Sequence, residues 1–118
     1  MTPPLQRFDS LNQFNFHDTL ADADGVSIVL FTKPGCSSCG KWRELLQNYV
    51  RKHLDTRLFE VDASADQALA QEFELFHLPS IHLFRNGEYF GELQCEARET
   101  VLGAALQDAL ARPPQDMP

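Results

Sequence analysis

The sequence predicts an α/β fold in which a mixed β-sheet is flanked by four helices. Strand-like and helix-like patterns of apolar residues alternate along the chain. One of them, "SIVLF" at 27–31, is a continuous apolar run, which is typical of a strand covered on both faces. Two later strand-like segments are separated by Asn86-Gly87, a strong signal for a hairpin. We therefore expect the order (β)αβαβαββα, in which the first strand is optional.

The segment before the "SIVLF" strand is expected to be a helix. Asp9 or Ser10 would cap it, and it would run over residues 11–22. Phe14 and Leu20 are expected on its buried side, and "ADG" would end it.

The middle of the chain predicts a helix, a strand and a second, shorter helix. Apolar residues recur at helical spacing over residues 39–54, which indicates an amphipathic helix. A short strand follows at 58–62 and stops at an aspartate. Leu69, Phe73 and Phe76 then mark one face of the shorter helix.

The last third of the chain is expected to hold the hairpin and a closing helix. The hairpin strands are "SIHLF" and "EYFGEL", and the helix covers residues 101–110. We expect one domain over residues 1–118, with an ordered core at about 5–111. The Pro-rich ends, "TPP" and "RPPQDMP", are expected to be frayed.

Composition restricts the classes of partner. Apolar residues make up 43% and charged residues 23% of the chain, as in an ordinary globular protein. The net charge of -7 argues against nucleic acid or an anionic membrane, because either partner needs a basic surface. No apolar run approaches the ~20 residues of a membrane helix, and the start of the chain does not resemble a signal peptide. Three cysteines are too few for a secreted disulfide scaffold, so we expect a cytoplasmic protein.

Two of those cysteines, Cys36 and Cys39, form a Cys-x-x-Cys pair in "FTKPGCSSCGKW". Such a pair is typical of half a zinc site, a redox dithiol or a structural bridge. Here it lies between a predicted buried strand and a predicted helix. The N–H groups and dipole at a helix start favour a thiolate there, which makes Cys36 the expected nucleophile and Cys39 the more sheltered thiol.

Zinc is the main rival for this pair. A structural zinc site needs four ligands, and the only other cysteine is Cys95, so a site would require Cys36, Cys39, Cys95 and a histidine such as His77. That ligand count favours the redox dithiol without removing the zinc alternative.

The chain resembles the thioredoxin-like superfamily over nearly its whole length. The resemblance lies in the strand before "CSSC", in "EVD" at a strand end, and in "HLPSIHLFRNGE". It implies the thioredoxin fold, with Cys36 as attacking and Cys39 as resolving thiol. It also implies that Leu78-Pro79 is a cis peptide lying against the disulfide, and that the Leu78 backbone is offered to an extended substrate chain.

The sequence departs from the thioredoxin pattern at and near the motif. Gly35 replaces a tryptophan, and Ser37-Ser38 replace Gly-Pro; these three positions border the substrate site of the family. Leu30 and Leu58 stand where thioredoxins have a buried aspartate and its companion lysine. Without that base we expect Cys39 to ionise slowly, which would prolong the mixed disulfide.

Several other side chains are candidate modulators of the dithiol. Lys33-Pro34 resembles glutaredoxins, in which the lysine holds glutathione, but "LQCEARET" lacks the Gly-Gly that completes that site. Lys33 is equally well explained as a surface lysine. His77 is either a loop histidine or a group that tunes the thiolate, and Cys95 is either an inert, buried side chain or a third redox thiol. His82 is expected to be a hydrogen-bonded core histidine.

The leading hypothesis is a thiol-disulfide oxidoreductase acting on a disulfide-containing protein through a mixed disulfide. Its electrons would come from a thioredoxin-reductase-type enzyme or a small thiol, and no metal or organic cofactor is implied. Two alternatives remain. One is a glutaredoxin-type, glutathione-linked reductase, and the other is a partner-binding module in which the dithiol is vestigial or regulatory.

Overall fold

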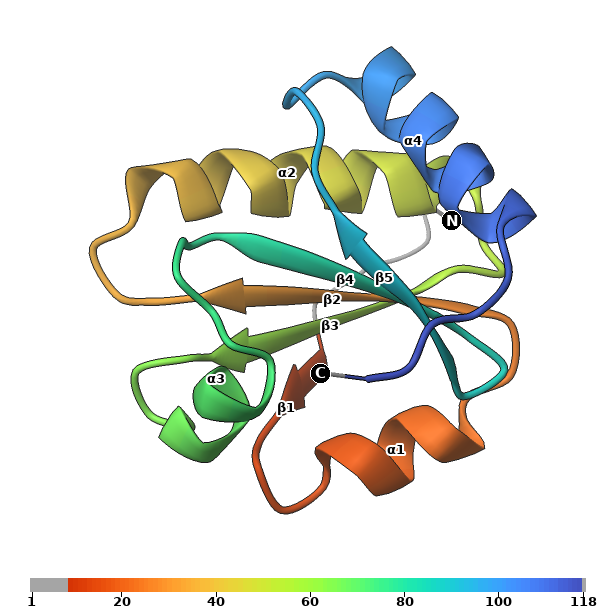
Figure 1. Ribbon diagram of the computed structural model, residues 1–118. Coiled ribbons are helices and arrows are strands. Elements are labelled where there is room, and N and C mark those ends of the chain that lie inside the picture. The colour runs from red at the N-terminus through yellow and green to blue at the C-terminus, as the bar shows by residue number, and fades with distance from the viewer. Residues whose placement is uncertain (1–8, 118) are drawn as a thin grey trace, which may run out of the picture.

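The computed structural model describes residues 9–117, which form a five-stranded sheet between two pairs of helices (Figure 1). The elements are β1 Asp9–Leu11, α1 Phe16–Asp22, β2 Val26–Thr32, α2 Ser37–Lys52, β3 Arg57–Asp62, α3 Gln67–Glu72, β4 Ser80–Arg85, β5 Glu88–Leu93 and α4 Glu99–Ala111. The strand order is β1-β3-β2-β4-β5. β1 and β2 each pair parallel with β3, whereas β4 is antiparallel to both β2 and β5. The expected element order, including the optional first strand, is confirmed.

The central strand β2 is buried on both faces, as its continuous apolar run indicates. Ile28 and Leu30 pack on one side with α2 and α4, and Val29 and Phe31 pack on the other with α1 and α3. In Figure 1, α2 and α4 lie above the sheet, and α1 and α3 lie below it. Because successive strand residues point to opposite faces, this one strand supplies both halves of the core.

The first helix begins later than the sequence predicted. Residues Asp9–Leu11 form β1, and α1 starts at Phe16. Leu11 is buried and pairs with Val61 of β3, so the burial of this side chain favours a strand. The side chain of Asn12 then accepts the backbone N–H groups of Phe14 and Asn15, which closes a turn before the helix.

Two further expectations fail with this boundary. Asp9 and Ser10 lie in β1 and cap no helix. Phe14 lies in the turn and is 85% exposed, although Leu20 is buried in α1 as expected.

The two middle helices also differ from the prediction at their ends. α2 begins at Ser37 and ends at Lys52, before the exposed Leu54. α3 ends at Glu72, because Glu74 takes a left-handed φ of 52° and the N–H of Leu75 bonds back to the carbonyl of Ala70. Leu69 and Phe73 are buried as predicted, but Phe76 lies beyond this stop and is 88% exposed.

The predicted hairpin is confirmed. Asn86 and Gly87 both have positive φ, 52° and 81°, and they connect the paired residues Arg85 and Glu88. A Cβ atom at Gly87 would lie 3.0 Å from the carbonyl oxygen of Ala21, so the close approach of α1 also favours glycine.

The C-terminal segment makes one backbone contact with the sheet. Residues 112–117 are exposed and follow α4 without regular structure. The backbone N–H of Gln115 nevertheless donates to the carbonyl of Tyr89 in β5, at 2.7 Å. The expectation of frayed ends stays a prediction, and the N-terminal "TPP" lies outside the described residues.

Candidate active site

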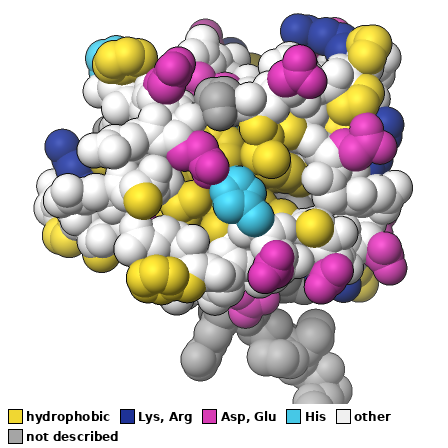
Figure 2. Space-filling model, turned by 60° about the horizontal axis from the view of Figure 1, so that its bottom comes forward, with side chains coloured by type: hydrophobic (Ala, Val, Ile, Leu, Met, Phe, Trp, Pro, Cys, Tyr) yellow, Lys and Arg dark blue, Asp and Glu magenta, His cyan; other side chains and the backbone are white. Residues whose placement is uncertain are grey.

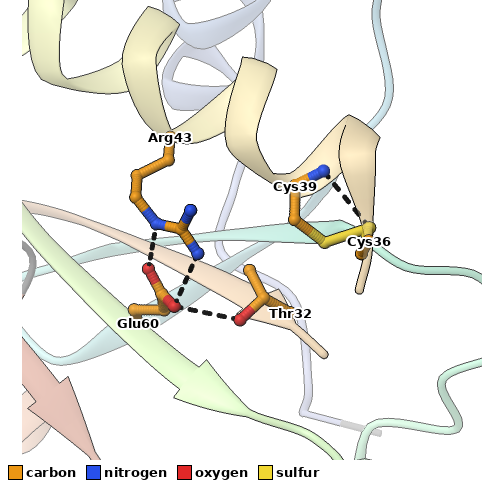
Figure 3. Close-up of a disulfide and its surroundings, with 5 residues drawn as sticks. All are labelled: Thr32, Cys36, Cys39, Arg43 and Glu60. Atoms are coloured by element: carbon orange, nitrogen blue, oxygen red, sulfur yellow. Dashed lines mark hydrogen bonds and ion pairs between the residues drawn. A yellow bond between two sulfur atoms is a disulfide. The ribbon is translucent and has the colours of Figure 1, made fainter. Parts of the chain in front are cut away.

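The two cysteines of the motif lie at the junction of β2 and α2, where they are joined in a disulfide (Figure 3). β2 ends at Thr32, and α2 begins immediately after Cys36. The Cα atoms of Cys36 and Cys39 are 5.3 Å apart. The short loop between the elements turns at Gly35, whose φ of 77° favours glycine.

Cys36 is the N-cap residue of α2. Its sulfur accepts the backbone N–H of Cys39 at 3.2 Å, and the first helical turn holds no acidic residue. The same donor and the helix dipole would stabilise a thiolate after reduction, because both direct positive potential at this sulfur. Cys36 is half-buried and Cys39 is only 2% exposed, so the expected difference in accessibility is confirmed.

Ser37 and Ser38 form the exposed start of α2. Within residues 9–117, neither hydroxyl makes a hydrogen bond to the sulfur of Cys36. Lys33 is exposed in the loop and takes part in no ion pair with another described residue. Its surroundings are those of a surface lysine.

The peptide bond between Leu78 and Pro79 is cis. The half-buried Pro79 lines a surface hollow of about 330 Å³, which Trp42 of α2 also lines. The backbone N–H and carbonyl of Leu78 bond to no other residue in the described part of the chain.

Cys95 and His77 both line this hollow. Cys95 is partly buried against the core, and burial, helped by the Glu96 carboxylate, raises the pKa of its thiol. A raised pKa keeps the thiol protonated and unreactive, which favours an inert Cys95. His77 is exposed at the rim.

A polar network that the sequence did not indicate lies beside the dithiol (Figure 3). Arg43 of α2 donates two hydrogen bonds to the carboxylate of Glu60 on β3, from Nε at 2.8 Å and from Nη2 at 3.0 Å. The hydroxyl of Thr32, at the end of β2, donates to the same carboxylate at 3.0 Å. One available signal was the spacing of Arg43, which comes one helical turn after Cys39.

His82 is a hydrogen-bonded core histidine, as expected. The Ser80 hydroxyl donates to Glu92 at 3.0 Å, so it must accept the Nε2–H of His82 at 2.9 Å. Nδ1 of His82 then accepts the Tyr89 hydroxyl at 2.8 Å. Burial lowers the pKa of His82 to about 4, so the ring is neutral.

Leu30 and Leu58, at the positions of the buried charged pair of thioredoxins, are both buried in the aliphatic core under α2. That core supplies no titratable group at either position. Among residues 9–117, no three side chains of His, Cys, Asp or Glu come together as metal ligands. The zinc set considered from the sequence is therefore not assembled in the described structure.

A disulfide-forming Cys-x-x-Cys pair at the start of a helix, with a cis-proline following α3 in a βαβαβαββα fold, defines a thioredoxin-like protein. The sequence profile of the family described as "Thioredoxin" matches residues 7–108. The chain belongs to the thioredoxin family.

Individual relatives agree with this assignment. The chain is 36% identical over 78 residues to "Thioredoxin domain-containing protein 2" of Rattus norvegicus, covering 65% of this chain and 14% of that protein. It is 31% identical over 86 residues to "Probable protein disulfide-isomerase ER-60" of Schistosoma mansoni, covering 70% of this chain and 18% of that protein. The chain thus spans less than a fifth of either relative.

Solved structures show the same fold. Thioredoxin f2 of Chlamydomonas reinhardtii superposes with a TM-score of 0.75 over 91% of this chain and 99% of that one, at 19% identity. Within the described residues, none of the helices is long and apolar enough to cross a membrane.

Proposed function

We propose that this protein is a thiol-disulfide oxidoreductase that acts on disulfides in protein substrates. The observation that carries the proposal is the half-buried sulfur of Cys36 at the N-cap of α2, within disulfide-bonding reach of a buried Cys39. Family membership supports this chemistry in general, because relatives include proteins named as thioredoxins and protein disulfide-isomerases.

The reaction would begin with the reduced dithiol. The Cys36 thiolate attacks one sulfur of the substrate disulfide, forming a mixed disulfide and releasing the other sulfur as a thiolate. Cys39 loses its proton to solvent and attacks the Cys36 sulfur. The Cys36–Cys39 bond forms, the bond from Cys36 to the substrate breaks, and the substrate leaves with two electrons.

The hollow beside Pro79 would bind the substrate segment that flanks its disulfide. The N–H and carbonyl of Leu78, which bond to no other residue within 9–117, suit an added extended chain, because backbone hydrogen bonds of this kind are independent of sequence. Gly35, Ser37 and Ser38 would border the approach to Cys36, since all three are exposed. The absence of a large side chain there leaves the sulfur open to a bulky substrate.

Trapping the mixed disulfide tests this proposal. A Cys39→Ser protein can attack a substrate disulfide but cannot release it, so it should accumulate covalent adducts that dithiothreitol removes. Cys36→Ser is the matched control. It keeps Cys39 and Cys95 but should form no adduct, because it lacks the proposed nucleophile. Adduct formation by Cys36→Ser at the rate of Cys39→Ser would show that the assignment of the nucleophile is wrong.

The same experiment separates catalysis from partner binding. If Cys39→Ser forms no adduct with disulfide-containing proteins while the protein still binds a partner non-covalently, the enzyme proposal fails in favour of a binding module.

Electron donors are distinguished by assaying reduction with a thioredoxin reductase and with glutathione separately. We expect the reductase or a general dithiol to support turnover; turnover with glutathione alone would favour the glutaredoxin-type alternative. A cytoplasmic location stays a prediction.

A further inference from the structure

We infer that the Arg43–Glu60 ion pair controls the ionisation of Cys39, the resolving thiol. The cation favours its thiolate and the anion disfavours it. The consequence for catalysis rests on the proposed function, because it concerns the second step of disulfide exchange. Arg43 and Glu60 act through Cys39, so both are positioning residues.

The geometry places this pair on the sheet side of Cys39. Arg43 follows Cys39 by four residues on α2, so the two side chains leave the same face of the helix one turn apart. In Figure 3 the Arg43 side chain extends from α2 toward Glu60 on β3, and Thr32 lies between this pair and the disulfide. The two Arg43–Glu60 hydrogen bonds, at 2.8 and 3.0 Å, form a bidentate contact that fixes both groups.

Partial burial makes this pair more effective than an ordinary surface pair. The Arg43 and Glu60 side chains are 39% and 22% exposed, and the Thr32 residue that holds the carboxylate is buried. The hydrogen bond to Glu60 raises the pKa of Arg43, so the guanidinium stays charged. Its charges lie beside an aliphatic core, because Leu30, the register partner of Glu60, is apolar. Water screens the pair less than it would screen two exposed charges.

The two charges have opposite effects on a nearby thiol. Burial alone disfavours the Cys39 thiolate. The Arg43 cation favours the thiolate and lowers the thiol pKa, whereas the Glu60 anion raises it. In the intact pair these effects largely offset each other. Removing one partner exposes Cys39 to the uncompensated charge of the other.

Other titratable groups on the neighbouring elements act on the dithiol too. Asp62 at the end of β3 is an anion whose pKa is lowered mainly by the Ser64 hydroxyl. The other titratable groups on the loop, on α2 and at the hollow include Lys33, Lys41, Glu44, His77, Glu92 and Cys95. These groups are the same in all variants of Arg43 and Glu60, so their effects on the Cys39 pKa cancel when those variants are compared.

The direct test is a double-mutant cycle in which the reactivity of the Cys39 thiol is measured. Glu60→Gln, Arg43→Met and the double variant are made in a Cys36→Ser background, in which Cys39 titrates without its partner. The rate of alkylation of Cys39 by iodoacetamide is followed against pH by mass spectrometry, with Cys95 as an internal reference. Glu60→Gln should raise the rate at pH 7 about three- to tenfold, and Arg43→Met should lower it by a similar factor. The double variant should return close to the parent.

A merely structural role predicts a different pattern. Loosening α2 would expose Cys39 in both single variants and speed its alkylation in both, and the double variant would be at least as fast. That pattern, or no change in either single variant, overturns the inference. Arg43→Lys keeps the cation and should retain the parental profile. Circular dichroism checks each fold, and Arg43→Gln replaces Arg43→Met if the latter does not fold.

The redox equilibrium gives a second readout in proteins that keep both cysteines. Stabilising a thiolate stabilises the reduced form, so Glu60→Gln should make the dithiol more oxidising and Arg43→Met more reducing against a glutathione buffer. Alkylation of Cys39 requires no substrate. If the opposite shifts appear but no disulfide exchange does, the proposed function fails and this inference stands. If disulfide exchange occurs without the shifts, the inference fails and the proposed function stands.

Discussion

The two faces of the sheet differ in the kind of core they hold and in where they place titratable groups. Under α2 and α4 the core is mostly aliphatic, and one ion pair on this side, Arg43–Glu60, lies partly exposed at the edge next to the dithiol. Under α1 and α3 the core is mostly aromatic and encloses a fully buried histidine, His82. Figure 2 turns this second face toward the viewer and shows hydrophobic side chains at its centre.

The two faces are therefore expected to affect different properties: the charged pair affects the reactivity of the thiols, and the buried histidine affects the stability of the fold. A charged pair at a partly exposed edge contributes little to folding, but it acts on any thiol beside it. A neutral histidine inside an aromatic cluster lies away from solvent, and changing its charge acts on the folded state. We therefore expect substitutions under α1 and α3 to change the free energy of unfolding, and substitutions of the ion pair to change thiol chemistry.

The largest effect is expected from the aromatic cluster. Phe16 is fully buried and packs edge-on against Phe73 and Phe84, so Phe16→Ala should lower the free energy of unfolding by about 3–5 kcal/mol. Phe14→Ala, two residues earlier, is the matched control and should change it by no more than about 0.5 kcal/mol. Urea unfolding measures both. Equal losses in the two variants would contradict the assignment of Phe14 to the surface.

A smaller, pH-dependent effect is expected at His82. Its pKa is about 4 in the folded protein and 6.5 in the unfolded chain, so between these values the unfolded state binds more protons. The stability contributed by the neutral ring is complete above pH 6.5 and is lost as the pH falls toward 4. The loss amounts to roughly 2–3 kcal/mol.

The measurement is the free energy of unfolding of the wild type and of His82→Gln at several values of pH. Both proteins carry the same carboxylates, so the difference between the two curves isolates the histidine. The curves should converge as the pH falls from 7 to 4. Parallel curves would show that the buried ring does not resist protonation.

The smallest effect on folding is expected at Arg43–Glu60. The pair is bidentate but partly exposed, and exposed pairs typically contribute under about 1 kcal/mol. A double-mutant cycle of unfolding free energies for Glu60→Gln and Arg43→Met should therefore give a coupling of about 1 kcal/mol or less. A coupling of several kcal/mol would make the pair a structural element and blur the distinction between the two faces.

The sequence predicted those features that follow from local chemistry. Each of these features follows from a local pattern and is found in the structure. They are the strand in the apolar run before Thr32, the turn at Asn86-Gly87 and the pairing of Cys36 with Cys39. The resemblance to thioredoxins added the Leu78–Pro79 peptide, which is cis.

The features that were missed depend on contacts distant in sequence or on local turns that the apolar spacing does not reveal. The start of the first helix was misplaced because Leu11 is buried by β3, some fifty residues further along. Phe14 and Phe76 look like core residues by spacing, but a turn and a left-handed residue place them outside their helices. The Arg43–Glu60–Thr32 network joins three elements, and no local pattern brings them together.

The most direct test of the proposed chemistry is which cysteine of the reduced protein reacts first. With limiting iodoacetamide near pH 6.5, we expect Cys36 to be alkylated roughly tenfold or more ahead of Cys39 and Cys95, because it alone combines access with the start of a helix. Mass spectrometry locates the modification. Alkylation of Cys39 or Cys95 as fast as Cys36 would contradict the assignment of Cys36 as the nucleophile.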